Sequence, residues 1–263
     1  MTETGKCISS VTASVLKMLG VSYPETIAGE NDEIMKFCDK ADRAVIYNPD
    51  AVALWLYEKY PEFFKEAEEN SEDSFALKSV MPSVTPVCFA SMYTGLTPDE
   101  HGIKKYEKPV LTVDTMFDYL IKAGKKVAIV STAGDSISKI FLNRNMDYFI
   151  YPTKGKVNKT AKKLIAEKKY DVLVIYNGDY DAAMHVVGPE GRAALRHLKA
   201  NLKTYNEIVT LIKETYKDET VFYGFCPDHG CHLIDGGHGS HGLDMPEDMN
   251  VVHFYGVNRI GKN

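Results

Sequence analysis

The 263-residue sequence lacks a hydrophobic run that could cross a membrane, because no apolar stretch approaches 18 residues. Its first ten residues, MTETGKCISS, also lack the basic and then apolar pattern of a secretory signal. These two absences predict a protein of the cytoplasm with no membrane partner.

Cysteine is scarce, and its spacing does not suit a disulfide framework. The chain has five cysteines, an odd number, which favours free thiols in a reducing compartment. Cys226 and Cys231 flank a histidine cluster, so zinc ligation by sulfur is an alternative. No second cysteine pair completes a four-cysteine zinc site.

An excess of basic residues is also missing, since the formal net charge is −5. Proteins that bind nucleic-acid polymers usually carry a basic surface, so we expect no such partner. The net charge does not exclude a local basic pocket. The chain contains no internal repeat and no low-complexity linker, and we predict a single domain over residues 1–263 with an N-terminal helical extension over about residues 1–40.

What is present is an alternation of short apolar runs with helical patterns. Such an alternation implies crossover connections, and therefore an α/β fold with a mainly parallel central sheet and helices on both faces. We expect strands near 44–47, 75–80, 126–130, 171–176, 220–225 and 250–255, and helices near 8–19, 51–60, 86–93, 113–122, 158–168 and 190–216.

Polar clusters follow several of these strands. Asp50, Thr85, the pair Asp179 and Asp181, and the pair Asp228 and His229 each come after a different predicted strand. In parallel α/β sheets, ligands bind beyond the carboxyl ends of the strands. We therefore expect a functional site at this edge.

The segment DYDAAMH places Asp181 and His185 four residues apart. On a helical turn the two side chains share one face and can bind one metal ion. For this pair alone, an exposed surface contact is the simpler interpretation.

Two further segments, CPDHGCH and DGGHGSHG, carry Asp228 with His229 and His238 with His241. Glycines around these residues permit sharp turns and close approach to a ligand, and imidazole is a common zinc ligand. A plain turn and a flexible loop are the alternatives. His232 and His238 remain possible substitutes for His241.

Thr85 begins a helix in MPSVTP, with Pro86 in the first helical position. The simpler interpretation is a well-formed helix start. The same geometry also suits a nucleophile, because the helix N-terminus attracts phosphate and a nearby metal would lower the pKa of the hydroxyl. Together the clusters supply three carboxylates, three imidazoles and a hydroxyl, which suits two divalent cations.

At these residues the sequence resembles the alkaline phosphatase superfamily, and especially its nucleotide pyrophosphatase/phosphodiesterase branch. The stretch from Met81 to Ile103 resembles the nucleophile motif of that branch, with Thr85 ten residues before Gly95. DYDAAMHVVGP, PDHG, GSHGLD and VIYNPDAV resemble its metal-binding motifs. The resemblance spans roughly residues 43–255.

The resemblance implies an alkaline phosphatase-like fold and two divalent ions, zinc or, as in the mutase relatives, manganese. One ion would be bound by Asp181, His185 and His241. The other would be bound by Asp50, Asp228 and His229, with Thr85 between the two ions.

The chain departs from the family pattern at two places. Cys88 stands where diesterases of this branch carry an asparagine that helps hold a phosphoryl oxygen, so Cys88 marks the expected substrate-binding position. Only eleven residues separate His229 from His241, where relatives usually insert a long segment. We therefore expect a compact member without a large cap domain.

The sequence thus predicts an enzyme, a metal-dependent hydrolase that cleaves a small phosphodiester, nucleotide pyrophosphate-type or related phosphate ester through a phospho-threonine intermediate on Thr85. A phosphomonoesterase, phosphonate hydrolase or phosphomutase on the same site is the first alternative. A catalytically weak metal- or nucleotide-binding protein is the second. No Cys-x-Pro-x-Arg motif is present, which argues against a sulfatase.

Overall fold

The computed structural model describes residues 6–261 and is built around a seven-stranded sheet in the order β2-β9-β6-β1-β5-β3-β4. The five strands from β6 to β4 are parallel, whereas β9 runs antiparallel to both β6 and β2. The mainly parallel sheet predicted from the sequence is confirmed. The strands are β1 (Arg43–Pro49), β2 (Asp73–Lys78), β3 (Val127–Thr132), β4 (Asp147–Tyr151), β5 (Val172–Asn177), β6 (Val221–Phe225) and β9 (Asn250–Asn258).

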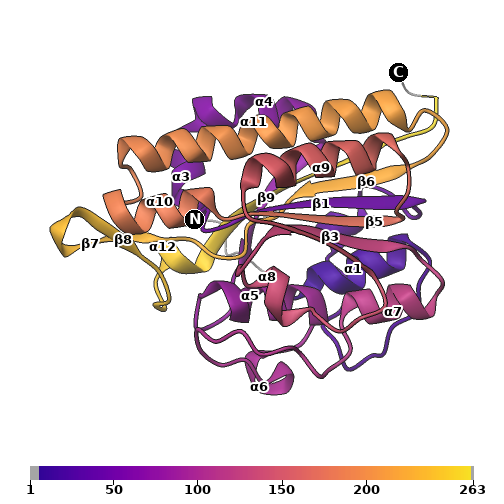
Figure 1. Ribbon diagram of the computed structural model, residues 1–263, viewed down its shortest axis with the longest axis horizontal. Coiled ribbons are helices and arrows are strands. Elements are labelled where there is room, and N and C mark those ends of the chain that lie inside the picture. The colour runs from indigo at the N-terminus through magenta and orange to yellow at the C-terminus, as the bar shows by residue number, and fades with distance from the viewer. Residues whose placement is uncertain (1–5, 262–263) are drawn as a thin grey trace.

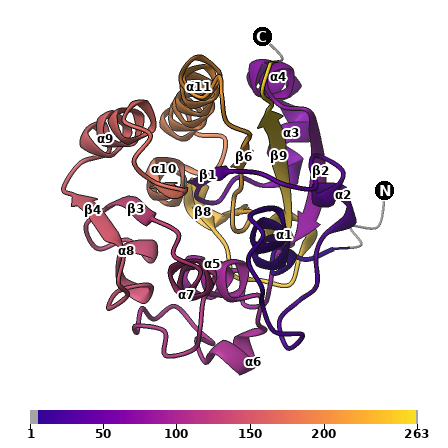
Figure 2. The same cartoon turned by 90° about the vertical axis from the view of Figure 1, so that its right-hand side faces the viewer.

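Helices cover both faces of this sheet, as predicted (Figures 1 and 2). Because the central strands are buried on both sides, they are apolar almost throughout. One face carries α3 (Leu54–Lys59), α4 (Pro61–Asn70), α9 (Lys154–Ala166), α10 (Asp179–Val187) and α11 (Arg192–Thr215). The other carries α1 (Ser10–Met18), α5 (Thr85–Thr94), α7 (Met116–Lys122) and α8 (Ile137–Ile140).

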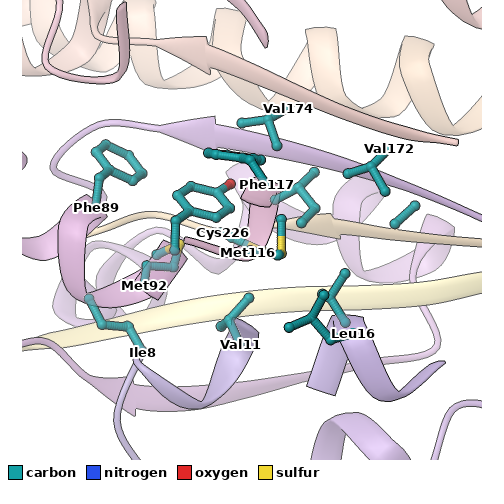
Figure 3. Packing of buried hydrophobic residues seen from close by; sticks show 14 of the residues in the cluster. Ile8, Val11, Leu16, Phe89, Met92, Met116, Phe117, Val172, Val174 and Cys226 are labelled. Atoms are coloured by element: carbon teal, nitrogen blue, oxygen red, sulfur yellow. The ribbon is translucent and has the colours of Figure 1, made fainter. Parts of the chain in front are cut away.

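The N-terminal helix α1 is part of the main core. Its residues Val11 and Leu16 pack in the same buried cluster as Met92 of α5 and Phe117 of α7 (Figure 3). The buried Thr12 hydroxyl donates a hydrogen bond to the Met92 carbonyl at 2.7 Å. The short helix α2 (Asp32–Met35) follows.

Several regions differ from the predicted elements, and strand β4 at the edge of the sheet was among those not predicted. The helix expected over residues 51–60 begins only at Leu54, because Ala51 has a left-handed backbone with φ 62°. The hairpin formed by β7 (His232–Ile234) and β8 (His238–Ser240), with the turn η1 (Asp235–Gly237) between them, was not predicted. It occupies the short span between His229 and His241, so the compact form expected there is confirmed. The remaining helices are α6 (Pro98–His101) and α12 (Pro246–Met249).

Within the described part of the chain, no helix combines the length and apolarity needed to cross a bilayer. The five cysteines, all within residues 6–261, are free thiols.

The buried His101 joins α5 to the loop that follows α6. Its Nε2 lies 3.0 Å from the Ser91 hydroxyl, and its Nδ1 accepts a hydrogen bond from the Ile103 amide at 3.2 Å. An accepting Nδ1 requires a neutral ring, and burial lowers the pKa of His101 to about 4. His101 therefore stabilises the packing of α5 against the loop after α6 and has a structural role.

We expect His101 to make stability fall in acid. Its pKa is about 4 in the folded protein against 6.5 unfolded, so the unfolded chain takes up the proton first as the pH falls. Stability from the neutral ring is full above pH 6.5 and is lost toward pH 4, by up to about 3 kcal/mol. The free energies of unfolding of the wild type and His101→Asn, measured with urea, should differ at pH 7 and become more similar at pH 4.5. A constant gap between the two proteins would contradict this.

Candidate functional site

The predicted site residues meet at one edge of the sheet, because β1 lies between β5 and β6 with all three strands parallel. Asp50 follows β1 directly, Asp228 comes shortly after β6, and Asp181 lies in the first turn of α10, which follows β5. Loops that leave adjacent parallel strands emerge side by side.

A first group consists of Asp181, His185 and His241, each of which offers a ligand atom within 4.8 Å of the others. Asp181 and His185 share one face of α10, as their spacing predicts. Asp181 Oδ1 lies 3.3 Å from His185 Nε2 and 3.4 Å from His241 Nε2. The carboxylate oxygen thus faces two imidazole nitrogens.

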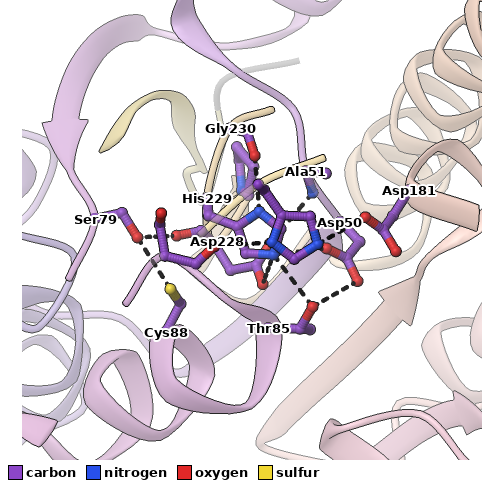
Figure 4. A network of polar contacts seen from close by, with 12 residues as sticks. Asp50, Ala51, Ser79, Thr85, Cys88, Asp181, Asp228, His229 and Gly230 are labelled. Carbon is purple, nitrogen blue, oxygen red and sulfur yellow. Dashed lines mark hydrogen bonds and ion pairs between the residues drawn. The ribbon is translucent and has the colours of Figure 1, made fainter. Parts of the chain in front are cut away.

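A second group consists of Asp50, Asp228 and His229, and all three side chains are buried (Figure 4). His229 Nε2 lies 3.3 Å from Asp50 Oδ1 and 3.4 Å from Asp228 Oδ2. The strained Ala51 backbone contributes to this arrangement, because its amide donates a hydrogen bond to Asp228 Oδ1 at 3.3 Å.

Backbone carbonyls fix the orientation of all three imidazoles. Nδ1 of His185, His229 and His241 donates to the carbonyls of Gly239, Gly230 and Ser83 at 3.0, 2.9 and 2.9 Å respectively. Because a carbonyl only accepts, each Nδ1 carries the proton, and Nε2 of each ring points into its group, where it offers a lone pair to a cation when the ring is neutral. Metal-binding histidines in proteins are usually oriented in this way.

The carboxylates complete the fit to a cation. Asp50 Oδ1, Asp181 Oδ1 and Asp228 Oδ2 are buried and accept no hydrogen bond among the described residues. They are also the oxygens that face the Nε2 atoms. Buried acceptors that face other acceptors are costly, and a bound cation satisfies both kinds of atom at once. The donor sets therefore fit two divalent ions.

The electrostatics of the site agree with this fit. Burial, together with the nearby charge of Asp181, raises the pKa of Asp50 to about 7. Burial and the charge of Asp50 raise the pKa of Asp228 well above its usual range. Burial also acts to raise the pKa of Asp181, but the contacts with His185 and His241 outweigh it and lower that pKa. The second group carries the larger uncompensated repulsion.

Thr85 is the first residue of α5, and its side chain lies against the second group. The hydroxyl is 3.4 Å from Asp50 Oδ2 and 3.2 Å from His229 Nε2 (Figure 4). The backbone amide of Thr85 donates no hydrogen bond to any described residue. A free amide at the N-terminus of a helix is suited to an anion such as a phosphoryl oxygen.

Cys88 does not lie at the surface of this site. It has no exposed area, and its sulfur lies 3.1 Å from the Ser79 hydroxyl, which donates to the Asp228 carbonyl at 2.6 Å. The geometry therefore offers a substrate no accessible atom of Cys88, and the substrate contact predicted for this residue has no support here. Its contacts instead connect α5 to the Asp228 loop.

The alternative ligands lie outside both groups. His238 is exposed, and its Nδ1 is 3.2 Å from the His185 carbonyl. His232 is paired with the buried Asp248, with 2.7 Å between Nδ1 and Oδ1. Cys226 and Cys231 are fully buried, and burial raises the pKa of both thiols, so neither favours the thiolate that zinc requires.

Two residues that support the ligand groups, Asp248 and Tyr176, were not predicted from the sequence. Asp248 accepts hydrogen bonds from the Leu243 amide at its carboxylate and from the Gly230 amide at its carbonyl, at 2.9 and 2.7 Å. It thereby connects the loops that carry His229 and His241. The Tyr176 hydroxyl donates to Asp50 Oδ2. Both contacts depend on tertiary structure, although the place of Tyr176 near the end of a predicted strand was a weak signal.

Residues 48–118 match the family model described as type I phosphodiesterase / nucleotide pyrophosphatase. This segment contains Asp50 and Thr85. The predicted resemblance to the nucleotide pyrophosphatase/phosphodiesterase branch is confirmed over this segment. The matched family is one of enzymes.

Solved structures share the fold at low sequence identity. Human ectonucleotide pyrophosphatase/phosphodiesterase 5 matches 81% of this chain and 87% of its own, with a TM-score of 0.61 and 12% identity. The murine protein matches 74% of this chain, with a TM-score of 0.58 and 12% identity, and this chain spans only 58% of the murine one. Phosphonoacetate hydrolase from Sinorhizobium meliloti 1021 matches 72% of this chain and 56% of its own, with a TM-score of 0.54 and 16% identity. No curated protein sequence matches the chain.

The two neighbouring histidines of the glycine-rich segment provide a direct test of the first group. Replacing His241, which faces Asp181, should remove a ligand, so His241→Ala should lose one of two bound divalent ions. His238→Ala should retain both, because that side chain is exposed and outside the group. Elemental analysis after zinc reconstitution measures the difference. Equal zinc content in the two variants would mean that His241 is not a ligand.

Proposed function

We propose that the protein is a metal-dependent hydrolase of a small phosphodiester or nucleotide pyrophosphate-type ester, with Thr85 as the nucleophile. The observation that carries the proposal is the position of the Thr85 hydroxyl. It lies at the N-terminus of α5, within 3.4 Å of two members of a buried group that contains unpaired carboxylate oxygens. The match over residues 48–118 supports the same reaction class.

Asp181, His185 and His241 would hold one ion, and Asp50, Asp228 and His229 the other. Equal numbers of imidazole and carboxylate ligands favour zinc, with manganese as the alternative. When bound, such ions supply the positive charge that lowers the pKa of a hydroxyl and stabilises phosphoryl oxygens. The free thiols of the chain favour a reducing compartment such as the cytoplasm.

The reaction would proceed in two displacements at phosphorus. In the first, the Thr85 oxygen forms a bond to phosphorus as the bond to the leaving oxygen breaks, and the leaving oxygen departs with the proton that Thr85 releases. Asp50 Oδ2 is the acceptor on hand for the Thr85 proton, since His229 Nε2 would hold an ion. The free Thr85 amide would bind a phosphoryl oxygen. Water then cleaves the phospho-threonine and restores the hydroxyl.

The charge distribution around Thr85 favours a diester over a monoester. Lys104 and Lys105 pair with Asp99 and Glu107 on the surface, and Arg192 and Arg196 of α11 are exposed. None of these four cations has a described contact with Thr85 or with the ligand groups. A diester carries one negative charge fewer than a monoester dianion and needs fewer cationic partners.

A phosphonate is the second candidate substrate, because two of the fold's neighbours differ in what they bind. One murine structure, an inactive variant with a threonine replaced by alanine, is in complex with AMP. The Sinorhizobium meliloti enzyme is in complex with phosphonoacetate or phosphonoformate. The fold therefore accommodates both chemistries.

Replacing the nucleophile should abolish turnover without removing the ions. For Thr85→Ala we expect kcat to fall by at least about 10³-fold, because among the described residues no other serine or threonine hydroxyl contacts a side chain of the second group. Zinc content should stay at the wild-type value. Thr97→Ala, which removes an exposed threonine hydroxyl from the start of α6, is the matched control and should keep its activity. Near-normal kcat in Thr85→Ala would show that a different group attacks phosphorus.

The substrate class can be tested with matched aryl esters on the zinc-reconstituted protein. We expect kcat/KM for an activated aryl phosphodiester to exceed that for the corresponding monoester by tenfold or more, about 1.4 kcal/mol in transition-state binding. An aryl phosphonate in the same series tests the second candidate. A tenfold preference for the monoester would instead place the enzyme among the phosphatases.

A further inference from the structure

Tyr176 is a buried side chain with its hydroxyl directed at the second group. It is the penultimate residue of β5 and is 4% exposed. Its hydroxyl donates a hydrogen bond to Asp50 Oδ2. Its ring packs edge-on against Phe89 of α5, with 5.6 Å between centroids and 82° between planes. The tyrosine is therefore held between the sheet and the helix that begins with Thr85.

The hydrogen bond from Tyr176 divides the two oxygens of Asp50 between different partners. Oδ2 receives the Tyr176 hydroxyl and lies 3.4 Å from the Thr85 hydroxyl. Oδ1 accepts no hydrogen bond and lies 3.3 Å from His229 Nε2. A carboxylate held at one oxygen loses its freedom to rotate, so the other oxygen keeps a fixed direction.

The backbone around Tyr176 leaves room for this hydroxyl. A Cβ atom at Gly178 would lie 2.5 Å from the Tyr176 hydroxyl oxygen, so a larger residue there would displace it. The Asp50 amide donates to the Asn177 carbonyl at 3.0 Å, which fixes the start of the Asp50 loop against the end of β5. Strand pairing and side-chain contact thus place the two residues together.

We propose that Tyr176 is a positioning residue, which holds Asp50 so that Oδ1 is presented to the ion of the second group while Oδ2 remains beside Thr85. This inference rests on the proposed function, because it assumes that Asp50 is a ligand. Tyr176 would act through Asp50 alone and would not contact substrate. Its removal should therefore weaken one ion site and leave the other unchanged.

The test is zinc titration calorimetry on chelator-treated protein. Tyr176→Phe removes only the hydroxyl, and we expect one of two zinc affinities to fall by about tenfold or more, in the range found for lost outer hydrogen bonds to ligands. Tyr205→Phe is the matched control: that tyrosine is equally buried, and its hydroxyl lies 2.9 Å from Ser71, away from both groups. It should retain both affinities.

Two single variants, each of which lacks one ligand group, identify the site at which the zinc affinity falls. In His241→Ala the second group remains, and adding Tyr176→Phe should weaken its zinc binding. In Asp228→Ala the first group remains, and adding Tyr176→Phe should change nothing. Gly178→Ala, which displaces the hydroxyl without removing it, provides a second variant if Tyr176→Phe does not fold, and it should weaken the same site.

Three results would overturn the inference while leaving the proposed function in place: unchanged affinities in Tyr176→Phe, equal weakening of both sites, or the same loss in Tyr205→Phe. A wild-type protein that binds no zinc would overturn the proposed function together with this inference. Because the readout is metal affinity, these outcomes are separable without any substrate.

Discussion

The mutual repulsion of three carboxylates, two of them buried, at one edge of the sheet is the constraint on which the rest of this structure depends. Asp50, Asp181 and Asp228 each direct a buried oxygen without a hydrogen bond toward an imidazole Nε2. Charges in such surroundings are expensive unless a cation compensates them. A stable fold that assembles this cluster must gain something from it, and ion binding is the gain consistent with its geometry.

The fold assembles the cluster through strand order. Because β1 is flanked by β5 and β6 in parallel, the segments that follow these three strands bring carboxylates to the same edge. The strained Ala51 backbone turns an amide toward Asp228, and Asp248 connects the loops that carry His229 and His241. Helix α5 then brings Thr85 to the assembled ligands with its positive end. Each part of the site is thus held by a different element.

Much of this arrangement could be predicted from sequence because its signals are local. Apolar runs predict the central strands, and the spacing of Asp181 and His185 predicts a shared helical face. The burial of Cys88, the Tyr176 contact and the role of Asp248 could not be predicted, since each depends on residues distant in the chain. The hairpin β7–β8 was missed because three-residue strands in a glycine-rich segment carry little periodicity. The break after its strand placed Asp50 at this edge, whereas its role as a ligand was implied only by the resemblance of VIYNPDAV to the family motif.

The most direct test of the two-ion site is anomalous diffraction at the zinc edge from crystals of the zinc-reconstituted protein. Two anomalous peaks per chain are expected. One should be bounded by Asp181, His185 and His241, and the other by Asp50, Asp228 and His229, with the Thr85 hydroxyl beside the second. A single peak, no peak, or peaks held by His232, His238 or the cysteines would contradict the two-ion site on which the proposed reaction depends.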